Sequence, residues 1–171
     1  MFSFLFIAAL CASCLASPTS HSSFSPAVGG GSGTSFAIKK GDERLTGVRL
    51  WEIQGAYITG LQLRYGYIWS NRVGRVVGNP HELILFDGEV IVQVSGKYHN
   101  SNYIYQLMFV TSRGRSLIVG QPVQFSFNFY AAHPDAELSL LSGRNNSAGI
   151  TAIAAHWEHF DIQTTALPMS D

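Results

Sequence analysis

Two glycine-rich segments have the residue types and spacing to bind a ligand through the backbone. One is the run GGGSG at 29–33, and the other is the loop GRNNSAGIT at 143–151, which leads into an alternating apolar stretch. Glycine has no Cβ, so neighbouring N–H groups can approach a ligand and donate to its hydroxyl oxygens. Taken alone, the run at 29–33 is equally typical of a flexible linker. It is not a dinucleotide-binding fingerprint, because no strand precedes it and no helix follows it.

Other chemistries are not favoured by the sequence. The segment His156-Trp157-Glu158-His159 could suggest a metal cluster, but alternate residues of a strand face opposite sides, so the two histidines point apart. Zinc needs converging ligands, and the pattern instead favours Trp157 in the core. The chain has no GxSxG elbow, no P-loop, no acidic calcium loop and no identifiable pair of facing carboxylates. We therefore expect no enzyme activity, no metal and no cofactor.

Residues 1–16 are typical of a secretory signal peptide. The apolar run from Phe2 to Leu10 is too short to span a bilayer, and small residues place a cleavage site after Ala16. Both cysteines, Cys11 and Cys14, lie in this segment, so the mature chain is expected to have neither a disulfide nor a thiolate metal site. We expect a secreted, extracellular protein without a transmembrane segment, stabilised by its core.

The rest of the chain is long enough for one domain with one sizeable core. Its 11 acidic and 11 basic residues balance, which argues against nucleic acid as a partner. Residues 17–26 are rich in Ser and Pro and are predicted to be a flexible lead-in. The domain is expected at 27–160 and a loose tail at 161–171. Within the domain, short alternating runs separated by Gly and Asn predict an all-β fold.

A repeat runs through the domain. Ile58, Ile104 and Ile150 are 46 residues apart, and a strand pattern in the same phase follows each of them. The matching positions three residues later are Leu61, Leu107 and Ile153. An upstream apolar position recurs at Val48, Val94 and Leu140. Three copies of a strand–loop–strand unit predict three similar sheets that bury one face against one another. Chance similarity between evenly spaced strands is the alternative.

The chain also resembles the jacalin-related lectins, most closely the animal zymogen granule membrane protein 16 group. The resemblance covers about 27–160 and rests on the order and spacing of several segments. These are GGGSG at 29–33, TGVRL at 46–50, ITGLQLRYG at 58–66, VIVQVSGKY at 90–98, MFVTSRGR at 108–115, HP at 133–134, LSGR at 141–144 and AIAAHW at 152–157. It implies a jacalin-like β-prism of three four-stranded sheets with pseudo-threefold symmetry. It also implies a secreted, glycan-binding lectin that passes through secretory granules.

The family binds sugar through three loops at one end of the prism. The resemblance places these loops here at 29–31, 97–102 and 143–151. The residues it implies as carbohydrate-binding are Gly29, Gly30, Gly31, Lys97, Tyr98, His99, Asn100, Gly143, Ala148, Gly149 and Thr151. In this set the amides of Ala148 and Gly149 are expected to be available to the sugar, and Tyr98 or Tyr103 to cover its apolar face. The loops lack the basic residues of relatives that bind sulfated glycosaminoglycans, so heparin-like partners are not expected.

Thr151 departs from the family pattern. The third loop of the family ends in an aspartate that accepts hydrogen bonds from two sugar hydroxyls, and alignment back from AIAAHW places Thr151 there. Charge-assisted hydrogen bonds are roughly twice as strong as neutral ones, so Thr151→Asp is expected to strengthen mannoside binding. The loop is also one residue longer than usual, and Asn145-Asn146-Ser147 is a glycosylation sequon that would place a glycan on Asn145. The alternative function is a lectin fold without sugar binding that acts as a protein-interaction module.

Overall fold

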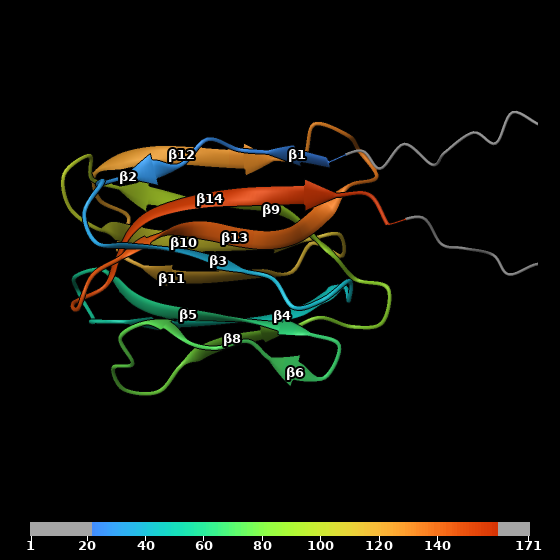
Figure 1. Ribbon diagram of the computed structural model, residues 1–171, viewed down its shortest axis with the longest axis horizontal. Helices are drawn as coiled ribbons and strands as arrows, with labels where there is room; N and C mark the ends of the chain where they lie inside the picture. The colour runs from blue at the N-terminus through green and yellow to red at the C-terminus, as the bar shows by residue number, and fades with distance from the viewer. Residues whose placement is uncertain (1–21, 161–171) are drawn as a thin grey trace, which may run out of the picture.

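The computed structural model describes residues 22–160, which form three antiparallel sheets and no helix (Figure 1). Sheet A contains β1 (Ser22–Phe24), β2 (Val28–Gly29), β3 (Thr34–Ile38), β13 (Glu137–Asn145) and β14 (Ile150–Glu158). Sheet B contains β4 (Leu45–Glu52), β5 (Ile58–Tyr65), β6 (Ile68–Trp69), β7 (Val73–Gly74) and β8 (His81–Ile84). Sheet C contains β9 (Ile91–Tyr98), β10 (Ile104–Thr111), β11 (Ser116–Gly120) and β12 (Phe125–Tyr130).

The strand orders are β1-β14-β13-β3, β6-β5-β4-β8 and β11-β10-β9-β12. The predicted β-prism is confirmed. In sheets A and B one edge is divided between two short strands, since β2 also pairs with β14 and β7 with β5. These sheets therefore have five strands where four were predicted, although each still has four strand positions.

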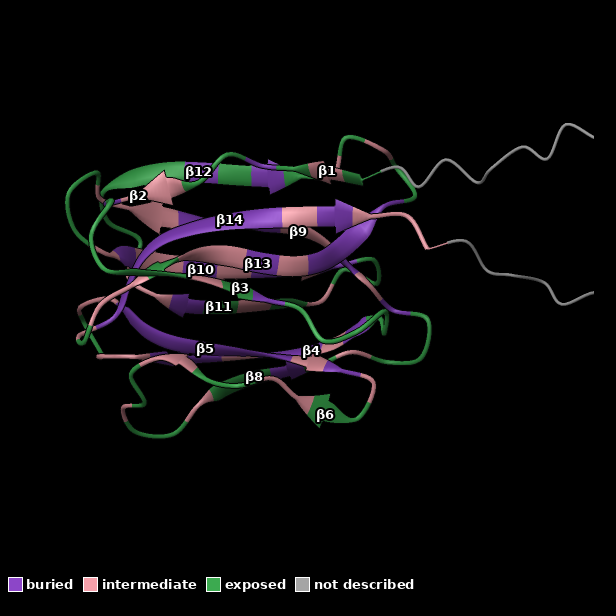
Figure 2. Cartoon of the chain, in the orientation of Figure 1, coloured by how far each residue is buried: buried purple, intermediate pink, exposed green. Residues whose placement is uncertain are grey.

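The core lies where the apolar faces of the three sheets meet, and Figure 2 shows β5 and β14 buried along most of their length. Ile58, Ile104 and Ile150 each begin a central strand and are fully buried. The residues three positions later are also 0% exposed: Leu61, Leu107 and Ile153. Because matching residues begin matching strands and bury to the same degree, the repeat of the sequence is a structural repeat.

The prediction of Leu140 as the upstream apolar position in the third copy of the repeat was wrong. Val48 and Val94 each pair with the sixth residue of the following central strand, but the sixth residue of β14, Ala155, pairs with Leu141. Leu141 is fully buried, whereas Leu140 is only half-buried. The β13–β14 hairpin has one residue fewer between its strands than the other two hairpins, so a constant spacing assigns the wrong residue there.

The predicted flexible lead-in at 17–26 is wrong from Ser22 onward. Residues Ser22–Phe24 form β1 and pair with the end of β14. Ser25 is buried, and its Oγ accepts a hydrogen bond of 3.2 Å from Nε1 of Trp157, which is fully buried in the core as predicted. This pairing covers the edge of β14 and explains why the segment is ordered. The predicted signal peptide at 1–16 and the tail at 161–171 lie outside the described residues.

One end of the prism, at the left of Figure 1, carries three equivalent loops at 30–33, 75–80 and 121–124. Each loop follows a glycine that packs against the second residue of a central strand. A Cβ on Gly29, Gly74 or Gly120 would lie 2.2, 2.3 or 2.1 Å from the carbonyl oxygen of Thr151, Thr59 or Tyr105. The next amide donates to that same carbonyl at 2.7 Å from Gly30, 2.7 Å from Arg75 and 2.8 Å from Gln121. The three loops thus start in the same way on all three sheets.

The loops also share a left-handed backbone position. Gly33 has φ 93°, Gly78 has φ 64° and Gln124 has φ 79°, and each is the fourth residue after the anchoring glycine. Glycine accepts this conformation without a Cβ clash. The positive φ of Gln124 is therefore a consequence of the shared loop geometry.

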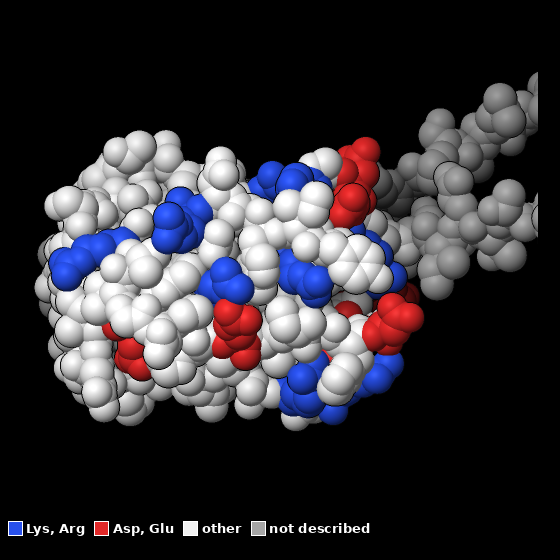
Figure 3. All heavy atoms as spheres, turned by 90° about the horizontal axis from the view of Figure 1, so that it is seen from below, with Lys and Arg blue, Asp and Glu red and all other residues white. Residues whose placement is uncertain are grey.

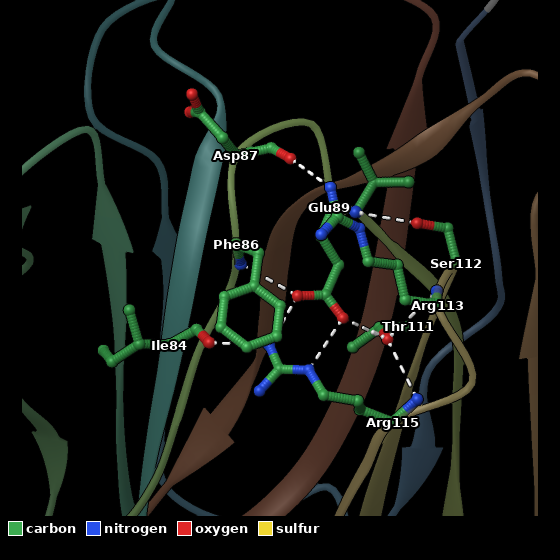
Figure 4. Close-up of polar contacts among 9 residues, drawn as sticks. Ile84, Phe86, Asp87, Glu89, Thr111, Ser112, Arg113 and Arg115 are labelled. Atoms are coloured by element: carbon green, nitrogen blue, oxygen red, sulfur yellow. Dashed lines mark hydrogen bonds and ion pairs between the residues drawn. The ribbon is translucent and has the colours of Figure 1, made fainter.

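At the other end of the prism a buried carboxylate joins sheets B and C (Figure 4). The side chain of Glu89 has 0% exposure and accepts hydrogen bonds from Phe86 N at 2.8 Å and Thr111 Oγ1 at 2.5 Å. Arg115 donates to it through Nε at 3.0 Å and stacks on the Phe86 ring, 4.0 Å from its centroid. The hydrogen bond from Arg115 is the main reason that the pKa of Glu89 falls to about 2, with the Phe86 and Thr111 donors adding to it.

Glu89 is expected to make the unfolding free energy of the protein depend on pH. A carboxyl group whose pKa is lowered by folding stabilises the folded state above its ordinary pKa of 4.5, and this stability is lost as the pH falls towards about 2. Glu89→Gln should therefore flatten the dependence of the unfolding free energy on pH across that range, measured by urea denaturation at several pH values. Glu82→Gln, at an exposed carboxylate, is the control and should retain the wild-type slope. Equal slopes for Glu89→Gln and wild type would contradict this role.

Candidate functional site

The glycine run at 29–33 lies between the hairpins at 99–103 and 146–149. A Cβ on Gly30 would lie 2.9 Å from the carbonyl oxygen of Asn102, and one on Gly33 would lie 2.2 Å from that of Asn145. A Cβ on Gly149 would lie 3.0 Å from the ring of Tyr57. Side chains at these glycines would force the loops apart. The structure therefore brings the three predicted loops together at one end.

Thr151 holds the glycine loop in place. Its side chain has 0% exposure, and its Oγ1 donates a 2.6 Å hydrogen bond to the carbonyl of Ser32. The Arg144 guanidinium donates at 2.9 Å to the next carbonyl, that of Gly33. These two bonds fasten the loop to sheet A at adjacent residues. In this arrangement the Thr151 hydroxyl is committed to the protein and does not face a ligand.

The expectation that the amides of Ala148 and Gly149 are available is wrong for this structure. Both donate to Oδ1 of Asn146, at 2.9 and 3.1 Å. The backbone N–H of Asn146 in turn donates to the carbonyl of Gly149 at 3.0 Å, and this bond closes the hairpin. Asn146 thus supplies the acceptor that a ligand oxygen would otherwise supply.

The second loop contributes less than its sequence suggested. Lys97 lies on the outer face of sheet C, where its Nζ donates to Ser126 Oγ at 2.8 Å. Tyr98 packs against Phe125 and Phe127, with ring centroids 5.9 and 6.1 Å away, so the structure does not present its ring to a ligand. Both residues thus contact β12, the neighbouring strand of sheet C.

The tip of the second loop is better placed. His99 Nδ1 accepts a hydrogen bond of 3.1 Å from the Ser101 amide, and Asn100 is exposed beside it. Tyr103 stacks on Tyr57 with ring centroids 4.0 Å apart and an angle of 12° between the planes. Both rings are half-buried and lie between two hairpins. Tyr57 was not singled out in the sequence, although it precedes Ile58 as Tyr103 precedes Ile104.

The amide of Gly31 is an accessible donor of the glycine loop. It is exposed, a Cβ placed on it would meet nothing within 4 Å, and its amide has no hydrogen-bond acceptor within 22–160. A groove of about 400 Å³ begins beside it and runs over sheet A. Its lining includes Gly29, Gly30, Gly143, Ser35, Arg144 and Ala152. An acceptor oxygen of a ligand can therefore reach Gly31 without displacing an internal bond.

The two histidines of the HWEH segment have different neighbours. His156 Nε2 lies 2.8 Å from Ser142 Oγ, and burial lowers the pKa of His156. The ring of His159 lies beside that of His133, with centroids 5.8 Å apart. Within the described part of the chain no group of three or more His, Cys, Asp and Glu residues could hold a metal ion. The described residues also contain no helix long and apolar enough to cross a membrane.

The structural role of Thr151 can be tested against its counterpart on sheet B, Thr59. Both side chains have 0% exposure, but the Thr59 hydroxyl has no partner among the described residues. Thr151→Val should lower the unfolding free energy by about 1 kcal/mol because it leaves the Ser32 carbonyl without its donor. Thr59→Val should be neutral or stabilising. Urea denaturation of both variants checks this. Equal losses of unfolding free energy in the two variants would contradict a stabilising role for the hydrogen bond from Thr151 to Ser32.

Comparison with known proteins agrees with this geometry. The profile of the Jacalin-like lectin domain matches residues 25–156, so the chain belongs to the jacalin-like lectin family. Zymogen granule membrane protein 16 of Rattus norvegicus is 41% identical over 155 residues, which cover 88% of this chain and 90% of that protein. The Homo sapiens protein of the same name is 41% identical over 156 residues, covering 89% and 91%.

A solved structure shares the whole architecture. The crystal structure of a prostate-specific WGA16 glycoprotein lectin superimposes with a TM-score of 0.71 at 29% identity. The match covers 80% of this chain and 100% of that one. The two proteins thus share the same fold over most of this chain.

Proposed function

We propose that this protein is a secreted lectin that binds glycans at the end of the prism formed by the glycine loop and the adjacent hairpins. Membership of the jacalin-like lectin family supports carbohydrate binding. The exposed Gly31 amide at the head of the groove is the observation that carries the proposal, because it can donate to a sugar hydroxyl oxygen as the structure stands. The relatives named zymogen granule membrane protein 16 support a route through secretory granules.

The proposed ligand is a neutral glycan. On the face formed by sheet B, basic and acidic side chains are interspersed, as in the 2.6 Å pair Arg49–Glu82 (Figure 3). A surface of mixed charge gives no long-range attraction for a polyanion. The donor and acceptor set also differs from the family pattern, because Thr151 is buried and Asn146 occupies two amides. We infer that mannose is not bound in the usual family manner.

A second candidate function is a protein-interaction module on a lectin fold. The self-closed hairpin at 146–149 favours it, since the loop satisfies its own donors without a ligand. The two functions differ in whether any glycan binds at this end. A lectin would recognise the glycans of a partner glycoprotein, whereas an interaction module would bind the protein part of its partner.

A glycan array probed with the mature protein tests the proposal. The protein is prepared without a glycan on Asn145, so that binding reflects the bare loop. Gly31→Val is expected to abolish the array signal, because the open space around this residue accepts the side chain without strain while the amide is covered. Ser116→Val, at an exposed residue of β11, is the matched control and should keep the signal. No signal for the wild type, or an unchanged one for Gly31→Val, would contradict glycan binding at this loop.

A further inference from the structure

The third loop begins with an acceptor sequence for N-linked glycosylation, which ligand binding does not use. Asn145-Asn146-Ser147 is the only such sequence in the chain, and it lies where β13 ends and the hairpin at 146–149 begins. Glycosylation adds a bulky polar chain to the asparagine Nδ2 in proteins that pass through the secretory pathway. The position of Asn145 in the fold determines what such a glycan would cover.

The two asparagines of this sequence differ in their side-chain contacts. Asn146 is fully engaged, because its Oδ1 accepts from the amides of Ala148 and Gly149 and its Nδ2 donates to the Tyr103 hydroxyl at 3.4 Å. The side chain of Asn145 is partly exposed and makes no hydrogen bond to another residue of the range 22–160. The asparagine that the sequence marks for modification is therefore the one with a free amide group.

Asn145 lies directly against the glycine loop. It pairs with Thr34, the first residue after that loop. A Cβ on Gly33 would lie 2.2 Å from the Asn145 carbonyl oxygen and 3.0 Å from the Asn146 nitrogen, so the two backbones are in contact. A glycan on Asn145 would thus start beside Gly33, two residues along the chain from the exposed amide of Gly31.

The groove over sheet A begins at the same place. The neighbouring register pair, Arg144 and Ser35, contributes to the lining of this groove of about 400 Å³. The Arg144 guanidinium also donates to the Gly33 carbonyl at 2.9 Å, which holds the loop next to the groove. The first sugar unit on Asn145 would therefore lie where the glycine loop and the groove meet.

We propose that Asn145 carries an N-linked glycan and that this glycan covers the glycine loop and the groove beside it. The glycosylated chain is then a masked form, in which the Gly31 amide is closed to other ligands, and the unglycosylated chain is the open form. The masking of a sugar site rests on the proposed function. The presence of the glycan and its cover over Gly31 do not.

Mass spectrometry of the protein secreted by a eukaryotic cell line tests the modification. The wild type should be heavier than its sequence by one N-glycan, and peptide N-glycosidase should remove the added mass. Ser147→Ala, at an exposed residue, destroys the acceptor sequence and should carry no glycan, whereas Ser147→Thr preserves the sequence and should carry it. A secreted wild type without a glycan would overturn the proposal.

A thiol at position 31 reports whether the glycan covers the loop. Outside the predicted signal peptide the chain has no cysteine, and a Cβ on Gly31 meets nothing within 4 Å, so Gly31→Cys introduces one accessible thiol. A maleimide should label this thiol severalfold more slowly in the glycosylated protein than in the same variant with Ser147→Ala. Ser116→Cys, at an exposed residue of β11, is the control and should react equally in both backgrounds. Equal rates at position 31 would overturn the cover.

The glycan array separates this inference from the proposed function. Masking of a working sugar site predicts a signal for Ser147→Ala and little or none for the glycosylated wild type. If Ser147→Ala gives no signal while the labelling rates at position 31 differ, the cover stands and the proposed glycan binding fails. Equal signals for Ser147→Ala and the glycosylated wild type would overturn the masking.

Discussion

The double variant Asn146→Ala, Thr151→Asp is expected to bind methyl α-mannoside about ten- to a hundredfold more tightly than the wild type. Removal of the Asn146 side chain releases the amides of Ala148 and Gly149, which now donate to its Oδ1. Aspartate adds a charged acceptor at this position. A regained charged hydrogen bond contributes roughly 1.5–3 kcal/mol, which corresponds to that change in affinity.

Neither single substitution should suffice. Thr151→Asp alone leaves both amides occupied by Asn146, and it replaces the donor to the Ser32 carbonyl with a second acceptor. The double variant loses the Ser32 bond as well, so the two released amides account for its advantage over Thr151→Asp alone. The expectation from the sequence that Thr151→Asp strengthens mannoside binding is therefore revised. Asn146→Ala alone frees two donors but leaves the charged acceptor missing.

Isothermal titration of methyl α-mannoside into all four proteins makes the comparison. Asn146→Ala preserves the sequon at Asn145, so every protein is prepared without a glycan there. Asn128→Ala, at an exposed residue of β12, is the control for removing an amide side chain and should bind as wild type. If Thr151→Asp alone matches the double variant, Asn146 does not block the site.

Leu107→Ala is expected to lower the free energy of unfolding by about 3 kcal/mol, within the 2–5 kcal/mol usual for such core truncations. Leu107 has 0% exposure and lies on the central strand of sheet C, facing the other two sheets. Its counterpart on sheet B, Leu61, has the same burial and should show a similar loss. The similarity follows from the repeat, because equivalent residues fill equivalent places in one core.

Urea denaturation of the mature protein measures these losses. Ile118→Ala provides a matched control, since Ile118 is 55% exposed on β11, the strand that pairs with the strand of Leu107, and should change stability by less than about 0.5 kcal/mol. A loss for Leu107→Ala no larger than that of Ile118→Ala would show that the three sheets do not share one core.

The sequence predicted the repeated part of the fold because repeated strands keep the same apolar phase. Ile58, Ile104 and Ile150 all begin central strands. It assigned Leu140 in place of Leu141 because the hairpins differ in length, and periodicity does not record a register shift. It also missed β1, since a Ser-rich segment has little strand signal of its own and becomes ordered by pairing with β14.

The sequence predicted which loops meet but not how their hydrogen bonds are shared. The glycine run and the third loop do pack together, as the resemblance implied. The cap formed by Asn146 depends on the shape of one hairpin, and the burial of Thr151 depends on where the Ser32 carbonyl lies. On sheet B the hydroxyl of Thr59, the counterpart of Thr151, has no partner among the described residues. Such differences between equivalent loops become visible only when the three sheets are compared in space.

The central claim is that glycans bind at the end of the prism that carries the glycine loop. The most direct test is an NMR titration of ¹⁵N-labelled mature protein with the glycan that gives the strongest array signal. The account predicts that shifted amides gather in the loops at 29–33, 99–102 and 146–149, which share that end. Shifts confined to the opposite end, around Arg44, Tyr67 and Phe86, or no shift at saturating glycan, would contradict it.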